Sequence, residues 1–371
     1  MSALHDPTTH GGQLRQIAAQ HAISPEQLID FSANINPAGP PRSVRIAMSH
    51  ALEKPSTFTT YPDLELVELK RAIAEYVGAE PENVAVANGF VPLLDAALRS
   101  MKVKRCLLPV PSFGEYRRTL ENAGVVITLY RLSQGNGFEY EVGEILRALS
   151  DGACDAILLA NPQNPSGALC DAKRMLQLIE MATRQGITVL LDEAFIDYCP
   201  HGSVTKKSIQ QTNVIVFRSV TKFFAIPGLR VAYAISKSSY IDAINRFIPP
   251  WPITSFASDA VCAALQEDPY AEESRTTNVL RRLRLERDLV RLEIATYPSS
   301  GNFLLLRFSQ ETDAKVIWKR MILEEQIVLR SCANFEGLAE GHLRIAVRSE
   351  KENEKLILGL ERVLSDMNTT A

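Results

Sequence analysis

Short apolar runs alternate with amphipathic helical stretches from about residue 83 onward, and this alternation limits the folds open to the chain. Apolar strands separated by helices predict a mainly parallel sheet with helices on both faces, which is a three-layer αβα arrangement of the α/β class. Two further runs follow each other without room for a full helix, so we expect an antiparallel strand at one edge. The first runs are 84–86, 106–108, 125–127, 156–159 and 187–191, and the closely spaced pair is 214–217 and 231–235.

The pattern changes after residue 236. We expect long helices up to about residue 295, then strands at 303–308, 327–330 and 343–347 and helices at about 312–324 and 350–366. This order predicts a second, smaller α+β unit. The first forty-odd residues contain the turn-rich run SANINPAGPP and cannot form a core alone. The expected parts are therefore a segment at 1–45 that packs with the small domain, a large ligand-binding domain at 46–265 and the small domain at 266–371.

Charge and composition exclude several classes of function. The net charge of −3 gives no reason to expect a nucleic-acid partner, and the run RRLRLERDLVRL at 281–292 has the leucine spacing of a solvated helix face. No apolar run is long enough for a membrane helix, and MSALHDPTTHGG lacks the features of a signal peptide. The six cysteines show no CxxC pair or regular spacing, which argues against a disulfide framework. We expect a cytoplasmic globular protein with no metal.

Polar motifs follow several of the expected strands, and ligands of open parallel sheets bind beyond the carboxyl ends of the strands. Gly89 precedes a helix start at 90–92, where free N–H groups suit a phosphate, although a tight structural turn explains the same residues. Asn164, in NPQNPSG at 161–167, presents an amide at the sheet edge, and a purely structural turn is an equal alternative.

Two charged residues complete the set of motifs. Asp192 ends the apolar strand ITVLL, where a carboxylate is costly unless it is paired, for example with a protonated pyridine nitrogen; a helix N-cap is the alternative. Lys222 is flanked by apolar residues, which favour the neutral, nucleophilic amine. Ser219 and Thr221 precede Lys222 and Arg230 follows it, and hydroxyls with a guanidinium suit a phosphate dianion. An ordinary surface loop is a poor alternative, because this segment joins two apolar strands.

Together the motifs supply what one cofactor needs: a phosphate cradle, an amide for a phenolate, a carboxylate for a ring nitrogen and a lysine for an aldehyde. In this order they resemble the fold-type-I pyridoxal-phosphate (PLP) enzymes of the aspartate aminotransferase superfamily, over nearly the whole chain. The chain is most similar to the branch of L-threonine-O-3-phosphate decarboxylase and, next, histidinol-phosphate aminotransferase. The stretches that resemble the decarboxylase are HGG at 10–12, DFSANINP at 30–37, DEAFIDY at 192–198, RSVTKFFAIPGLR at 218–230 and LRSCANFEGL at 329–338.

The resemblance implies a role for each residue around the cofactor. Lys222 is similar to the lysine that holds PLP as a Schiff base. Asp192 resembles the partner of the pyridine nitrogen, Asn164 the partner of the phenolate oxygen, and Phe113 the aromatic side chain that stacks on the ring. The residues similar to the cradle of the cofactor phosphate are Gly89, Phe90, Val91, Ser219, Thr221 and Arg230.

The resemblance also implies a substrate end and a dimer. Arg344 is similar to the arginine that binds the substrate carboxylate. Arg330, His10 and Asn34 match positions that meet the substrate's own phosphate in this branch. Tyr61 resembles a tyrosine that reaches the cofactor phosphate of a neighbouring subunit, which implies a homodimer with shared sites. The implied substrate is therefore a phosphorylated amino acid.

The expected reaction is decarboxylation of L-threonine O-3-phosphate to aminopropanol phosphate and CO2, as in cobalamin side-chain synthesis. The chain departs from the family at Phe90, where small or acidic residues are usual, and at Gln13, where the decarboxylases commonly carry asparagine. Phe195 stands where aminotransferases usually carry tyrosine, which argues against transamination. A histidinol-phosphate-type aminotransferase is the alternative, and a PLP-binding regulator without catalysis is a third. Threonine phosphate and serine phosphate differ by one methyl group, worth about 1 kcal/mol of contact, and the sequence leaves that choice open.

Overall fold

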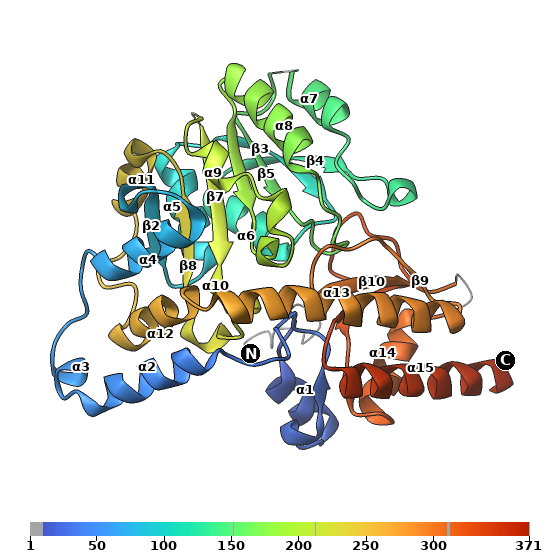
Figure 1. Cartoon of the computed structure of the whole chain (residues 1–371). Coiled ribbons are helices and arrows are strands. Elements are labelled where there is room, and N and C mark those ends of the chain that lie inside the picture. The colour runs from blue at the N-terminus through green and yellow to red at the C-terminus, as the bar shows by residue number, and fades with distance from the viewer. Residues whose placement is uncertain (1–9, 151, 212, 310–311, 371) are drawn as a thin grey trace, which may run out of the picture.

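The computed structural model describes residues 10–150, 152–211, 213–309 and 312–370. In this part of the chain, a seven-stranded sheet has the order β2-β8-β7-β6-β5-β3-β4 (Figure 1). Neighbouring strands are parallel, except that β8 runs antiparallel to both β2 and β7. In sheet order, the strands are β2 (Val84–Ala87), β8 (Ala232–Ile235), β7 (Val214–Ser219), β6 (Thr188–Asp192), β5 (Ala156–Ala160), β3 (Arg105–Val110) and β4 (Val126–Arg131).

The antiparallel strand lies inside the sheet, so the expectation of an antiparallel strand at the edge is wrong in position. β7 and β8 are joined by α10 (Val220–Phe223) and a 3-10 turn at Pro227–Leu229, which is too little chain for a crossover to a parallel neighbour. β8 therefore returns beside β7. β2, from earlier in the chain, pairs with the other side of β8 and forms the edge.

Helices cover both faces of the sheet, because alternate side chains of each buried strand point to opposite sides. Ala85, Leu108 and Leu158 lie in one core cluster with residues of α5 (Phe90–Ser100), α6 (Gly114–Asn122) and α11 (Ser238–Asn245). On the opposite face, Leu107, Ile157 and Leu191 lie in a cluster with α7 (Val142–Ser150) and α8 (Ala172–Arg184), while Val84, Val86 and Tyr233 lie in one with α4 (Val67–Val77). The sheet therefore forms the middle of three layers, as expected.

A smaller α+β unit follows the long helix α13 (Asp268–Arg291), which runs across the molecule from the large unit to the small one (Figure 1). Leu285 and Leu289, in the arginine-rich stretch, are buried in the core of the small unit. Its antiparallel sheet has the order β12-β13-β10-β9. The other elements from this half of the chain are α12 (Ser255–Leu265), β9 (Ala295–Thr296), β10 (Phe303–Arg307), α14 (Ala314–Leu323), β12 (Arg330–Ser331), β13 (His342–Ala346) and α15 (Glu350–Thr370).

The strand expected at 327–330 is two short strands in two different sheets. β11 (Ile327–Val328) pairs in parallel with β1 (Ile29–Asp30), whereas β12 pairs with β13. The chain changes its partner at Leu329, which is buried in the core of the small unit. Arg330 therefore follows, two residues later, the strand that pairs with the N-terminal segment.

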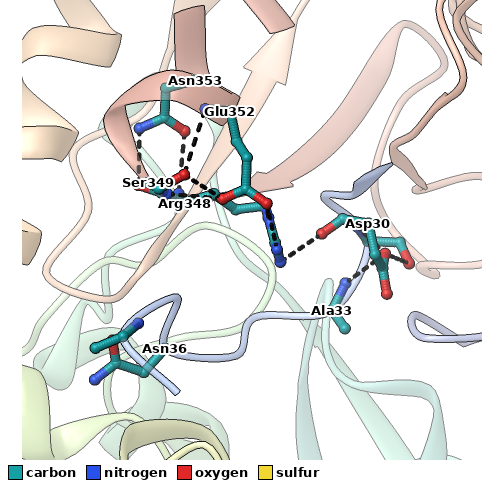
Figure 2. Close-up of polar contacts among 9 residues, drawn as sticks. Asp30, Ala33, Asn36, Arg348, Ser349, Glu352 and Asn353 are labelled. Carbon is teal, nitrogen blue, oxygen red and sulfur yellow. Dashed lines mark hydrogen bonds and ion pairs between the residues drawn. The ribbon is translucent and has the colours of Figure 1, made fainter. Parts of the chain in front are cut away.

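The N-terminal segment is attached mainly to the small unit, and the first nine residues of the segment expected at 1–45 lie outside the described residues. Ile17 of α1 (Leu14–His21) packs with Ile322 and Val328. Arg348 donates a hydrogen bond of 2.9 Å to the main-chain oxygen of Asp30 and pairs with Glu352 (Figure 2). The chain then continues through α2 (Arg42–Glu53), which lies against α12, and α3 (Ser56–Thr59).

The remaining described elements are short. They are α9 (Thr205–Ser208) and 3-10 turns at Pro25–Gln27, Pro81–Asn83, Gln134–Asn136, Ile196–Tyr198 and Pro200–Gly202. None of the described helices has the length and apolar character needed to cross a membrane.

Candidate active site

Asp192 lies at the carboxyl end of β6, with 8% of its surface exposed. Its carboxylate accepts hydrogen bonds from the Tyr116 hydroxyl at 2.6 Å and from the Ala194 N–H at 2.8 Å. Burial raises the pKa of Asp192, and the Tyr116 hydrogen bond and the charge of Lys222 oppose this rise. The site therefore holds a desolvated carboxylate whose ionised form depends on Tyr116 and on a nearby cation.

Lys222 follows β7 on the short helix α10. Its Nζ lies 3.5 Å from the Ser219 hydroxyl and 5.8 Å from the centre of the Phe195 ring. Burial lowers the pKa of Lys222; the Asp192 carboxylate raises it, and the positive charges of Arg230 and Arg344 lower it further. A larger fraction of this amine is therefore neutral at a given pH than for an ordinary lysine, which suits a nucleophile.

The residues expected to form a phosphate cradle lie at the ends of three strands, β2, β7 and β8. The hydroxyls of Ser219 and Thr221 lie 2.7 Å apart. Gly89, immediately before α5, has φ +96°, and a Cβ atom at this position would lie only 2.9 Å from Nη2 of Arg230. The Arg230 guanidinium therefore lies beside the start of α5, where the N–H groups of Phe90 and Val91 have no partner within the helix. Hydroxyls, a guanidinium and a helix start are donors suited to a phosphate.

Two aromatic side chains pack against Tyr116, which donates to the Asp192 carboxylate. Phe113 precedes α6 and is half-buried, and its ring meets the ring of Tyr116 edge to face at 5.5 Å. Phe90 packs against the other side of Tyr116 at 5.6 Å. Tyr116 was not among the residues predicted from the sequence, although its position three residues after Phe113 at a helix start places both on one helix face.

Arg330 and Arg344 lie directly opposite each other on β12 and β13. Both side chains are buried, and both guanidinium groups lie within 6.0 Å of the centre of the Phe335 ring. Arg344 donates to the Asn164 side-chain oxygen, and at 3.4 Å to the Ser32 main-chain oxygen. Burial and the charge of Arg330 lower the pKa of Arg344 to about 10. Two cations on facing strands destabilise each other, so this surface favours an anion.

His10 and Asn34 lie at the same end of the site. The His10 Nε2 lies 3.1 Å from a Glu115 carboxylate oxygen, and the His10 ring meets the edge of Phe113 at 6.4 Å. Asn34 is buried, its main-chain oxygen accepts from the Asn302 amide at 3.0 Å, and its side-chain oxygen has no hydrogen-bond partner among the described residues. An unpaired buried acceptor is costly in an isolated protein, which is typical of a ligand-binding position.

Tyr61, like Val91 and Arg230, is exposed in the single chain. It is 77% exposed and its ring stacks on that of Trp251 at 4.6 Å. Phe58 and Phe256 also contact each other, at 5.5 Å. The other predicted residues lie in one region, joined by the contacts given above.

Comparison with known families decides the class. The sequence matches the family described as Aminotransferase class I and II over residues 26–360. The chain belongs to this family. The members of the Aminotransferase class I and II family that it resembles include threonine-phosphate decarboxylase of Salmonella typhimurium, with 34% identity over 96% of this chain and 97% of that protein. The expected superfamily is thereby confirmed.

Two solved structures have a closely similar fold. The histidinol-phosphate aminotransferase of Clostridium acetobutylicum has a TM-score of 0.84 and 27% identity, with 91% of this chain and all of that chain covered. That of Sinorhizobium meliloti, in complex with pyridoxal-5'-phosphate, has a TM-score of 0.85 and 22% identity, covering 95% of each chain. Together with the observed sheet, they confirm the predicted fold class.

Proposed function

We propose that this protein is a PLP-dependent decarboxylase that converts L-threonine O-3-phosphate to aminopropanol phosphate and CO2, a step in cobalamin side-chain synthesis. The observation that carries the proposal is the pair of buried cations, Arg330 and Arg344, on facing strands, with Arg344 close enough to Lys222 for its charge to lower the pKa of that lysine. A substrate with both a phosphate and a carboxylate offers one anionic group to each guanidinium. The relationship to a threonine-phosphate decarboxylase over nearly the full length of both chains supports the same reaction.

The residues present fit PLP. Gly89 leaves open a space beside Arg230 that a Cβ atom would close, and the Ser219 and Thr221 hydroxyls lie close together at the neighbouring strand end. Asp192 is desolvated and lies near a lysine whose pKa is lowered. These positions match a phosphate cradle, a partner for a ring nitrogen and a nucleophile for an aldehyde.

Bound PLP would supply an electrophilic aldehyde and a protonated ring that accepts the electrons released when the Cα–carboxylate bond breaks. Asp192, kept ionised by Tyr116, would hold the proton on the ring nitrogen. Arg330 would bind the substrate phosphate and Arg344 the carboxylate, and this two-point attachment orients the substrate so that one bond at Cα is selected. Lys222 in its protonated form, or a water, would return a proton to Cα, and the lowered pKa of Lys222 makes its protonated amine a stronger proton donor than an ordinary lysine.

The aminotransferase alternative uses the same cofactor residues and differs in which bond breaks at Cα. Phe195 argues against it. Its ring is buried against Phe303 at 4.9 Å and near the Lys222 amine, so it offers no hydroxyl where the aminotransferases usually carry tyrosine.

Product analysis with three substrates in parallel tests the proposal. L-threonine O-3-phosphate, L-serine O-phosphate and histidinol phosphate are each added to the PLP-loaded protein, with and without 2-oxoglutarate. We expect CO2 from phosphothreonine, and a lower rate from phosphoserine because one methyl contact is worth about 1 kcal/mol. Glutamate formed from 2-oxoglutarate and histidinol phosphate, without CO2 from either amino acid, would support the aminotransferase instead.

Replacing Tyr116 with phenylalanine is expected to weaken PLP binding about tenfold or more at neutral pH. The ring and its packing remain, but Asp192 loses a hydrogen bond that favours its ionised form. The pKa of Asp192 then rises further, so on acidification Asp192 is protonated at a higher pH in the variant than in the wild type. The loss of PLP affinity on acidification therefore begins at a higher pH in the variant.

The dissociation constant of PLP is measured from pH 5 to 8 by absorbance. Tyr76→Phe is a matched control, since it removes a similar bond of 2.8 Å to a different carboxylate, Asp197. Equal affinity and equal pH dependence for Tyr116→Phe and the wild type would show that Tyr116 does not support Asp192.

We also propose a homodimer in the cytoplasm. An exposed aromatic surface supports the dimer: Tyr61, Trp251 and Phe58 are each more than 40% exposed, and apolar surface of this kind favours a protein partner. Tyr61 would then reach the site of the second subunit. The cysteines are all free thiols, which suits a reducing compartment.

A further inference from the structure

The main chain of residues 10–12 lies directly against Ser32. The Gly12 N–H donates a hydrogen bond of 2.9 Å to the Ser32 hydroxyl. A Cβ atom on Gly11 would lie 2.1 Å from the Ser32 main-chain oxygen, so no other residue type fits at position 11 without moving the backbone. Two segments twenty residues apart in sequence are therefore joined at one serine.

Asp30 fixes the orientation of that serine. One carboxylate oxygen of Asp30 accepts from the Ser32 N–H at 2.7 Å, from the Ser32 hydroxyl at 2.6 Å and from the Ala33 N–H at 3.3 Å. Because a hydroxyl has a single proton and this one is donated to Asp30, the Ser32 oxygen faces Gly12 as an acceptor. Arg348, itself paired with Glu352, holds the main-chain oxygen of Asp30 (Figure 2).

Three groups at the substrate end of the site depend on this arrangement. His10 immediately precedes Gly11 and meets Glu115 and Phe113. The Ser32 main-chain oxygen accepts from Arg344. Asn34, whose side-chain oxygen has no hydrogen-bond partner in the described part of the chain, lies two residues after Ser32. Asp30 and Ser32 thus link His10, Asn34 and Arg344 without being catalytic themselves.

We propose that Asp30 and Ser32 are positioning residues that hold His10 over the substrate phosphate through the Ser32–Gly12 hydrogen bond. The assignment of the phosphate end to His10 rests on the proposed function. The positioning role itself rests on contacts that exist whatever the substrate is.

Ser32→Ala removes the hydroxyl but leaves Asp30 bonded to the main chain. For L-threonine O-3-phosphate we expect KM to rise about tenfold, with kcat within about threefold of the wild type, because one hydrogen bond that orders the phosphate end is lost. Amide hydrogen exchange at Gly12 in the PLP-loaded protein should become faster. The matched control is Ser24→Ala, which alters an exposed serine of the same N-terminal segment.

A double-mutant cycle tests whether Ser32 acts through His10. If it does, Ser32→Ala adds little to the KM of a His10→Ala variant, whereas independent roles give multiplied effects. Gly11→Ala displaces residues 10–12 from Ser32, because the added Cβ atom would collide with the Ser32 main-chain oxygen. This variant should therefore show the same increase of KM as Ser32→Ala. An unchanged KM together with unchanged exchange at Gly12 in Ser32→Ala overturns the proposal. If the wild type releases no CO2, the proposed function fails, and the exchange measurement still decides the positioning role.

Discussion

Replacing Lys222 with alanine is expected to lower the rate of CO2 release from L-threonine O-3-phosphate by at least about 1000-fold. The amine lies beside Asp192 and Ser219, and burial keeps its pKa low.

Three measurements separate loss of chemistry from loss of folding in the Lys222→Ala variant. They are the rate of CO2 release, the visible absorbance of lysine-linked PLP and the thermal midpoint of unfolding. Lys207→Ala, at an exposed lysine of the same domain, is the control. The visible absorbance should disappear in Lys222→Ala alone, with folding retained. If Lys222→Ala keeps more than about a tenth of the wild-type rate of CO2 release, Lys222 does not take part in the chemical step.

Arg330→Gln is expected to raise KM for L-threonine O-3-phosphate about 100-fold. The substrate phosphate would lose its cationic partner, and removing one member of a buried charge pair costs several kcal/mol. L-threonine, which has no phosphate, should be affected much less. The variant removes one of two facing positive charges but also the Arg330 hydrogen bonds to Ser331 and Asn334, so the thermal midpoint of unfolding is measured alongside to confirm that the protein is folded.

The control for Arg330→Gln is Arg284→Gln, which breaks an exposed ion pair with Glu354. KM values for phosphothreonine and threonine are compared for the three proteins. An equal change of KM for both substrates in Arg330→Gln would mean that Arg330 does not recognise the phosphate.

The layers and the strand-end residues were predictable, because buried parallel strands are continuous apolar runs and their polar ends follow directly in sequence. The position of β8 inside the sheet was not predictable, since it depends on pairing with β2, which lies far away in sequence, and local patterns do not encode such pairing. The bond between Tyr116 and Asp192 joins residues 76 positions apart, and that between Arg344 and Asn164 joins residues 180 apart. The family resemblance predicted a role for Arg344 and for Asn164 but not the hydrogen bond between them. The roles of all site residues remain predictions.

The central claim is that the chain breaks the Cα–carboxylate bond of a phosphorylated amino acid. The most direct measurement is the ratio of CO2 to aminopropanol phosphate formed from L-threonine O-3-phosphate by the PLP-loaded protein without any 2-oxo acid. The account predicts equal amounts of the two products over many turnovers. Absence of CO2, with turnover that appears only when 2-oxoglutarate is added and yields glutamate, would contradict it.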